Sequence, residues 1–164
     1  MAKEPIETER KPWDHYFMGI VELVAKQSTC RYRHTGAIIV RSKRIIATGF
    51  NGAPPGVEHC TDTGVCVKDK AAKELSEQLG GHATGLADDF CVALHGEQNA
   101  IIQCAKHGIP TEGASIYILH SPCYRCAKMI AGSGIKEVIY KHEYPDQRAF
   151  EVLKQGNVAV RKLG

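Results

Sequence analysis

The chain has 164 residues, of which 43% are hydrophobic and 24% are charged, and its formal net charge is +3 with neutral histidines. This length suits one domain with its own core, and the composition is typical of a soluble globular protein. The basic residues are spread along the chain, which gives no indication of a nucleic-acid partner, and no secretory signal or membrane span is recognisable. We therefore predict a cytoplasmic protein.

The first third of the chain predicts a helix followed by a hairpin. The helix is expected over 13–28, where apolar residues recur at helical spacing. Two short apolar runs, 36–41 and 44–50, predict paired strands joined by a tight turn. The segment 51–56, NGAPPG, cannot continue a strand because it holds two prolines and two glycines.

The section from about 57 to 90 is interpreted as an insertion in a single domain that spans 1–164. It carries too few large apolar residues to fill a core of its own. It contains one predicted helix, at about 68–79, which Gly80 and Gly81 would end.

The second half alternates helices and strands. The expected order is helix 96–106, strand 114–120, a helix that begins near 123, strand 136–140, a helix from 146 that Gly156 caps, and strand 157–163. Gly108 is in a position suited to a left-handed helix cap. A hairpin followed by β-α-β units predicts an α/β fold with a mixed sheet, helices on both faces, and parallel strands on either side of the helix near 123.

Cysteine is abundant, with seven residues in the chain. An odd number in a reducing compartment argues against a disulfide framework, so these cysteines are expected to be buried groups, metal ligands or nucleophiles. Cys104, in the middle of an amphipathic helix, is expected in the core.

One pair of cysteines has the spacing of a metal site. Pro122-Cys123-x-x-Cys126 places two thiolates on the first turn of a helix, where the helix dipole lowers thiol pKa. His95 stands at the start of the preceding helix. If both helices begin at one edge of the sheet, His95 becomes a third ligand and one position stays open, which is typical of catalytic zinc.

Glu97 lies two residues after His95 and is placed to contact a metal-bound water and a substrate ring nitrogen. Either motif alone is weak: a C-x-x-C is often a generic metal or redox site, and an H-x-E occurs by chance. Together and in this order, H-x-E and P-C-x-x-C form the signature of zinc nucleobase deaminases.

The sequence resembles the deoxycytidylate (dCMP) deaminase family of the cytidine deaminase superfamily, above all its bacterial form encoded with the late competence proteins. The resemblance runs from Trp13 to Asp146 and leaves out about 68–90. The segments that carry it include GAIIVRSKRIIATGFNGAPPG, HCTDTGVC, HGEQNAIIQCAKHGIPTEGASIYILHSPCYRCAKMI and GIKEVIYKHEYPD.

This resemblance implies a three-layer α/β/α cytidine deaminase-like fold with a mixed five-stranded sheet. It implies a zinc-dependent hydrolase that converts dCMP to dUMP and ammonia for thymidylate synthesis, with Glu97 as proton shuttle. It also implies a homo-oligomer, a hexamer or a dimer, with dCTP as activator, dTTP as inhibitor and Mg²⁺ accompanying the regulatory nucleotide. Family members usually have alanine at the position of Gly96 and valine at the position of Thr35.

Further site residues follow from the family pattern and from position. The backbone around Ala37 is expected to pack against the base, and Asn51 is expected to contact the sugar. Further substrate-binding candidates are Arg31, Tyr124 and Arg125. Arg33 and His34 also lie near the expected entrance of the active site. The loop that includes Asn51, Gly52, Pro55 and Gly56 is either a plain turn or part of a dCTP site.

Four cysteines outside the motif suggest a second, structural zinc that would secure the insertion. They are Cys30, Cys60, Cys66 and Cys91, with His59 and His82 as substitutes. The alternative is that they are buried or free thiols.

Two other functions stay open at this stage. One is a different deaminase of the superfamily, acting on a free base, a nucleoside, a modified cytosine nucleotide or a tRNA base. The other is a non-catalytic zinc-binding protein of competence or DNA handling, although such a protein would have no use for Glu97.

Overall fold

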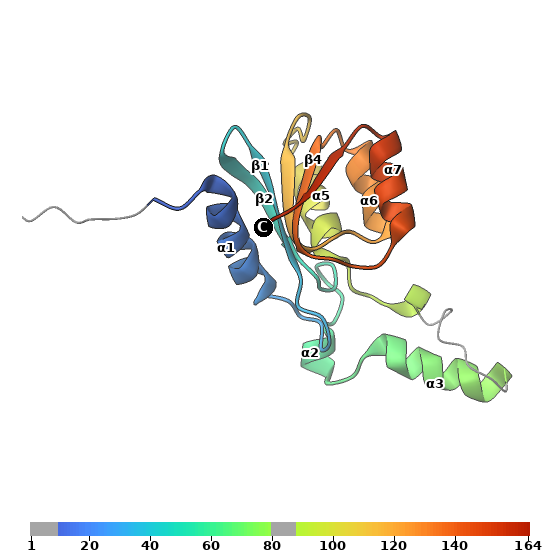
Figure 1. The fold of residues 1–164 in the computed structure, drawn as a ribbon. Helices are drawn as coiled ribbons and strands as arrows, with labels where there is room; N and C mark the ends of the chain where they lie inside the picture. The colour runs from blue at the N-terminus through green and yellow to red at the C-terminus, as the bar shows by residue number, and fades with distance from the viewer. Residues whose placement is uncertain (1–9, 80–87) are drawn as a thin grey trace, which may run out of the picture.

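The structure is a computed structural model that describes residues 10–79 and 88–164. These residues form a five-stranded sheet with the order β2-β1-β3-β4-β5 (Figure 1). The strands are β1 (Gly36–Arg41), β2 (Arg44–Phe50), β3 (Ser115–His120), β4 (Glu137–His142) and β5 (Ala159–Lys162). β1 runs antiparallel to β2 and β3, whereas β3, β4 and β5 are parallel, so the predicted mixed sheet and its parallel pair are confirmed.

Helices cover both faces of the sheet and make a three-layer α/β/α fold. α1 (Trp13–Ala25) lies on one face, and α5 (Gly96–Lys106), α6 (Tyr124–Gly132) and α7 (Gln147–Gln155) lie on the other (Figure 1). None of the helices in the described part of the chain is long and apolar enough to cross a membrane.

Alternate residues of the central strands supply two cores. Ile38, Tyr117 and Ile139 pack toward α1, while Ile39 and Ile116 pack toward the three-helix layer. Successive side chains of a strand point to opposite faces, so strands buried on both sides read as continuous apolar runs. The runs at 36–41 and 115–120 have this character.

Several element ends differ from the sequence prediction or refine it. β4 covers 137–142 rather than 136–140, and β5 covers 159–162 rather than 157–163. α1 stops at Ala25 rather than 28, and Ser28 lies beyond the helix. The hairpin turn uses Ser42 and Lys43, both in the left-handed region, as a twisted two-residue turn requires. After α7 the left-handed residue is Asn157, with φ 54°, rather than Gly156.

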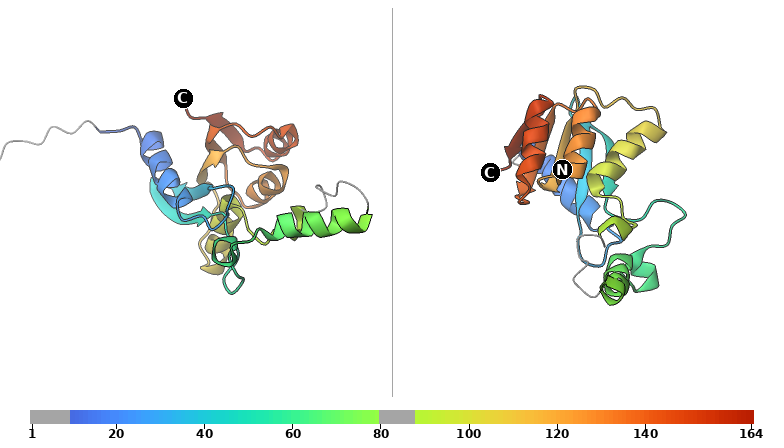
Figure 2. Two further views of the ribbon diagram at one scale, coloured as in Figure 1. Left: turned by 90° about the horizontal axis from the view of Figure 1, so that it is seen from below. Right: turned by 90° about the vertical axis from the view of Figure 1, so that its right-hand side faces the viewer.

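The insertion lies to one side of the sheet (Figures 1 and 2). Its described part contains the short helix α2 (Cys60–Thr63), the predicted helix α3 (Val67–Leu79) and the 3-10 turn η1 (Asp88–Phe90). Gly80, Gly81 and His82 lie outside the described residues. The insertion is closed at its base by an antiparallel bridge in which Gly52 and Leu94 exchange hydrogen bonds of 3.1 and 2.9 Å.

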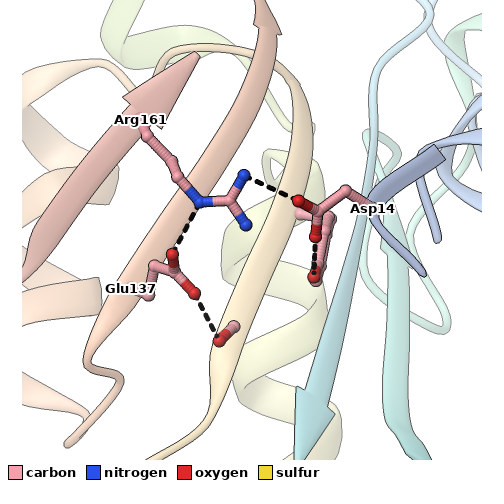
Figure 3. Close-up of polar contacts among 5 residues, drawn as sticks. Asp14, Glu137 and Arg161 are labelled. Carbon is pink, nitrogen blue, oxygen red and sulfur yellow. Dashed lines mark hydrogen bonds and ion pairs between the residues drawn. The ribbon is translucent and has the colours of Figure 1, made fainter. Parts of the chain in front are cut away.

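A charged network ties α1 to the sheet on the face opposite α5 (Figure 3). Arg161 on β5 contacts Asp14 on α1 at 2.8 Å and Glu137 on β4 at 2.7 Å. Asp14 also accepts a 2.8 Å hydrogen bond from the Tyr117 hydroxyl. The Arg161 guanidinium holds the pKa of Asp14 below its usual value.

Candidate active site

Three potential metal ligands stand at the starts of two helices. His95 precedes α5 as its N-cap, where its backbone N–H donates to Gln98 Oε1 at 2.8 Å. Cys123 is the N-cap of α6, and Cys126 is buried in the first turn of that helix. Because both helices begin at the same edge of the sheet, the side chains converge as the sequence predicted.

The donor atoms of these three residues form one compact group. His95 Nδ1 is 3.6 Å from Cys123 Sγ and 3.4 Å from Cys126 Sγ. All three lie within 4.8 Å of one another, and the described ranges contain no other such group of three histidine, cysteine or acidic residues. One imidazole nitrogen and two thiolate sulfurs are donors that zinc binds, and three protein ligands leave a fourth position for water or substrate.

The protonation of the two thiols suits a metal site. Cys126 and His95 donate hydrogen bonds to Cys123, and these contacts hold the pKa of Cys123 at about 4. The pKa of Cys126 is raised because its thiol serves as the donor to Cys123 and because it is buried. These contacts favour the thiolate form of Cys123, which is the form of cysteine that binds a cation.

Glu97 is placed beside this group by the first turn of α5. The residue is only 8% exposed and lines the same cavity as His95 and Cys123. Burial raises the pKa of the Glu97 carboxyl. A buried carboxyl next to metal ligands is suited to accepting and releasing protons.

The cavity has a volume of about 360 Å³. Its lining comes from the ends of β1, β2 and β3, from the loops beside them, and from the first turns of α5 and α6. The lining residues are Tyr32, Arg33, His34, Thr35, Gly36, Asn51, His95, Glu97, Ile118, Leu119, His120, Ser121, Cys123 and Tyr144. Glu97 is the only carboxylate among them, whereas Arg33, His34 and His120 are basic.

The start of α5 is held close to the hairpin by two glycines. A Cβ at Gly49 would lie 2.2 Å from Gly96 O and 2.4 Å from Ala100 N, so only glycine fits there. A Cβ at Gly96 would lie 3.2 Å from Gly49 O and 3.3 Å from Ala37 N, which is tight but less severe. This contact fixes the depth at which His95 and Glu97 sit.

The structure places the predicted substrate-binding residues in two groups. Asn51 lines the cavity; Ala37 is fully buried, and its neighbours Thr35 and Gly36 line the cavity instead. Arg31, Tyr124 and Arg125 are not among the lining residues. Arg125 pairs with Asp89 at 2.7 Å, and the backbone N–H of Tyr124 donates to Asp146 at 3.0 Å.

Several lining residues were not among the sequence candidates, and His120 and Tyr144 are two of them. His120 ends β3, and Tyr144 follows β4, where its backbone N–H donates to Ser121 Oγ at 2.7 Å. Arg33 lies over the Tyr144 ring, with 5.7 Å from Cζ to the ring centroid. The signal that could have found them is position, since the carboxyl ends of parallel strands meet at one edge of a sheet.

A second cavity of about 550 Å³ lies between β2 and α5. Its lining includes Phe50, Ala53, Pro55, His59 and His107. Of the loop residues considered for a regulatory nucleotide, Pro55 lines this cavity and Asn51 lines the first one. Gly52 and Gly56 are not among the lining residues of either.

The remaining cysteines do not come together. The donor atoms of Cys30, Cys60, Cys66 and Cys91 form no group of three within 4.8 Å in the described part of the chain. Cys91 is exposed and the other three are partly buried. Cys104 is 1% exposed within the core, as predicted.

The chain belongs to the cytidine and deoxycytidylate deaminase family, because the model of that family's zinc-binding region matches residues 11–142. The matched stretch includes the whole His95, Glu97, Cys123 and Cys126 constellation.

Individual relatives narrow the similarity to deoxycytidylate deaminases. The chain is 36% identical to the deoxycytidylate deaminase of Mycobacterium phage D29, over 82% of this chain and 98% of that protein. It is 41% identical to ComE operon protein 2 of Bacillus subtilis (strain 168), over 94% of this chain and 73% of that protein. The crystal structure of the cyanophage S-TIM5 dCMP deaminase with dCMP and dUMP has a TM-score of 0.70 and 33% identity, covering 94% of this chain and all of that one.

Proposed function

We propose that the chain catalyses the zinc-dependent hydrolysis of dCMP to dUMP and ammonia and so supplies precursor for thymidylate in the cytoplasm. The observation that carries this proposal is one cavity whose described lining holds His95, Glu97 and Cys123, three further basic residues, and no carboxylate besides Glu97. The family membership and the dCMP deaminase relatives support the same activity.

Zinc is the metal that this donor set fits, held by His95, Cys123 and Cys126. When bound there, it would supply Lewis acidity that activates a water at neutral pH. Everything else that the reaction needs must come from the side chains around it.

Glu97 provides the proton transfers. Replacing an amino group by oxygen at C4 requires that the attacking water lose protons, that ring N3 gain one, and that the leaving nitrogen depart as neutral ammonia. Glu97 takes the first proton from the water and passes it to N3 as the C4–O bond forms. It then moves the second proton from that oxygen to the amine, the C4–N bond breaks, and the carbonyl of dUMP remains.

The basic residues bind the phosphate. Arg33, His34 and His120 line the same cavity, and Arg33 rests on Tyr144. Burial, His142 and Arg33 lower the pKa of His120, and a bound anion would stabilise the charged form of its imidazole. A nucleoside monophosphate would place its base toward Glu97 and its phosphate among these donors.

An ultraviolet assay of the purified zinc-loaded protein tests this proposal. We expect turnover of dCMP to exceed turnover of deoxycytidine and cytosine, which lack the phosphate, by about ten- to a hundredfold, because a charge-assisted phosphate contact contributes about 1.5–3 kcal/mol. Cys126→Ser should lose both zinc and activity. Faster turnover of deoxycytidine or cytosine than of dCMP would contradict the proposal.

The second cavity supports a proposal of regulation by dCTP and dTTP with Mg²⁺. It is larger than the first cavity, and Thr29, His59 and Gln103 supply polar groups beside Phe50 and Pro55. Calorimetric titration with dCTP and dTTP in the presence and absence of Mg²⁺ tests this regulation, and His59→Ala should weaken the binding.

A second zinc in the insertion also stays a prediction. Its support is that residues 29–32 touch the insertion at two points: Thr29 Oγ1 to His59 Nδ1 at 3.0 Å, and the Tyr32 hydroxyl to Asp69 at 2.5 Å. Cys30 lies between Thr29 and Tyr32 in the chain, and Cys60 and Cys66 lie between His59 and Asp69. Two zinc ions per chain by elemental analysis, with one lost in Cys60→Ser, would support it, and one ion in the wild type would exclude it.

A homo-oligomer is the last part of the proposal. Ile45 on β2 and Ile102 on α5 are 37% and 41% exposed, and the second cavity lies between these two elements. A second copy would shield them from water. Light scattering tests this, with Ile102→Glu expected to favour the monomer.

A further inference from the structure

The loop between α1 and β1 forms one wall of the catalytic cavity. Four consecutive residues of this loop, 32–35, line the cavity. Residues 29–35 lie outside helix and strand, so no regular hydrogen-bond ladder fixes their position. Their place must be set by other contacts.

Two buried polar side chains supply those contacts. Ser28 is 8% exposed and Asn51 is 6% exposed. Asn51 Oδ1 accepts a 2.9 Å hydrogen bond from the backbone N–H of Thr35, and Asn51 Nδ2 donates to the carbonyl oxygen of Arg33. The carboxamide of Asn51 therefore hydrogen-bonds to the loop backbone on both sides of His34.

Ser28 in turn orients Asn51. Its hydroxyl lies 2.5 Å from Asn51 Oδ1, 2.9 Å from Asn51 O and 3.1 Å from the carbonyl oxygen of Arg33. The hydroxyl has one proton, and the shortest contact is the one to Oδ1. Its oxygen also accepts from the backbone N–H of Cys30 at 3.2 Å. Without this donor, the amide could rotate and release Arg33.

We propose that Ser28 is a positioning residue that fixes the phosphate-binding wall of the cavity through Asn51 and Arg33, and so sets the preference for a nucleotide over a nucleoside. This inference rests on the proposed function. Ser28 does not line the cavity, so it acts only through its neighbours. The metal ligands and Glu97 belong to other elements, α5 and α6. Removal of the Ser28 hydroxyl should therefore not move them.

The test is Ser28→Ala, assayed on dCMP and on deoxycytidine. Loss of one hydrogen bond of this kind weakens binding by about five- to tenfold. We expect KM for dCMP to rise by about that factor with kcat within about twofold of wild type. Turnover of deoxycytidine, which shares the sugar near Asn51 but has no phosphate, should fall by a smaller factor than turnover of dCMP, and the zinc content should stay the same.

A double-mutant cycle with Arg33→Ala decides whether Ser28 acts through Arg33. If it does, Arg33→Ala alone raises KM for dCMP, and adding Ser28→Ala to it changes little more. Additive effects of the two variants would overturn the proposal, as would an equal loss on dCMP and deoxycytidine. Failure of the wild type to deaminate dCMP would instead overturn the proposed function.

Two further variants serve as controls. Ser133→Ala removes a hydroxyl that donates to the Ile130 carbonyl oxygen at 2.9 Å, at the far end of α6, and should leave both KM values unchanged. Ser28→Cys keeps a similar size and a weak donor, and should recover part of the affinity. If Ser28→Ala does not fold, Ser28→Cys replaces it in the double-mutant cycle. The proposal is then supported or overturned by the same results as for the alanine variant.

Discussion

The first turns of α5 and α6 and the insertion between 57 and 90 both hold cysteine and histidine side chains, but different forces position them. The catalytic ligands stand on helices packed by backbone contact onto a buried sheet, and their donor atoms meet within 4.8 Å. In the insertion, Cys60 begins the short helix α2 and Cys66 lies outside helix and strand, and among the described residues their donor atoms belong to no group of three within 4.8 Å. A metal site therefore exists before its metal only where packing of the core has already fixed its ligands.

The largest effect on activity should come from a substitution of Glu97, which is expected to change the chemical step without changing the packing of the core. Glu97→Gln keeps the size of the side chain and removes its proton-carrying oxygen. We expect kcat to fall by about a hundred- to ten-thousand-fold, with zinc content and thermal midpoint close to wild type. Retention of more than about a tenth of wild-type turnover would show that another group moves the protons.

Gly49 tests the claim that backbone contact places the ligands. Gly49→Ala would put a methyl group 2.2 Å from Gly96 O, so α5 must move away from β2. We expect a loss of about 1–3 kcal/mol in the free energy of unfolding and a clear loss of turnover. Urea denaturation measures the first quantity. Gly19→Ala, where no atom lies within 4 Å, is the matched control.

Gly96 should respond more weakly than Gly49. Alanine would gain up to about 1 kcal/mol of helix propensity, somewhat less in a first turn. Its Cβ would also press on Gly49 O and Ala37 N at 3.2 and 3.3 Å. The two effects oppose each other, so Gly96→Ala should change unfolding free energy by less than about 1 kcal/mol. A loss as large as that of Gly49→Ala would mean that the close approach matters more than the propensity.

Acid should weaken the contact between α1 and the sheet. The folded-state pKa of Asp14 is below the ordinary value of 3.8, so its bond to Arg161 stabilises the protein fully above about pH 4. That contribution disappears as the pH falls through the lower, folded-state pKa. Arg161→Gln should therefore cost about 1 kcal/mol or less at pH 7 and progressively less in acid. Urea unfolding from pH 7 to pH 3 checks this, and a difference that grows in acid would contradict it.

The smallest effect should come from the pair that joins the insertion to α6. Arg125 and Asp89 lie 2.7 Å apart, but their side chains are 63% and 67% exposed. Water and salt screen such a pair, so Asp89→Asn should change stability by less than about 0.5 kcal/mol and leave kcat unchanged. A tenfold fall in kcat would show that the insertion helps to hold the zinc-binding helix.

The sequence predicted those parts of the site that depend on local spacing. Cys123 and Cys126 meet because one helical turn joins them, and His95 and Glu97 share the first turn of α5. The meeting of these two pairs needed only the β-α-β order, which fixes both helix starts at one edge of the sheet. Apolar runs also predicted the five strands, with the bounds of β1 and β2 correct and those of β4 and β5 in error by one to two residues.

The remaining parts of the site depend on contacts between distant segments. Arg33 and His120 reach one cavity because β1 and β3 are neighbours in the sheet, which no local pattern indicates. Ser28 was expected inside a helix, and only the end of α1 at Ala25 frees it to bind Asn51. The close contact between Gly49 and Gly96 could not be predicted either, because it depends on how the helix layer packs on the sheet.

The bridge between Gly52 and Leu94 has a consequence for changes in chain length. It closes the loop of residues 53–93 directly before His95, so the first ligand keeps its register whatever the loop contains. Doubling the length of a closed loop costs only about 0.6 kcal/mol in entropy. A peptide or small reporter domain grafted between α2 and α3 would therefore be carried at little cost to the fold.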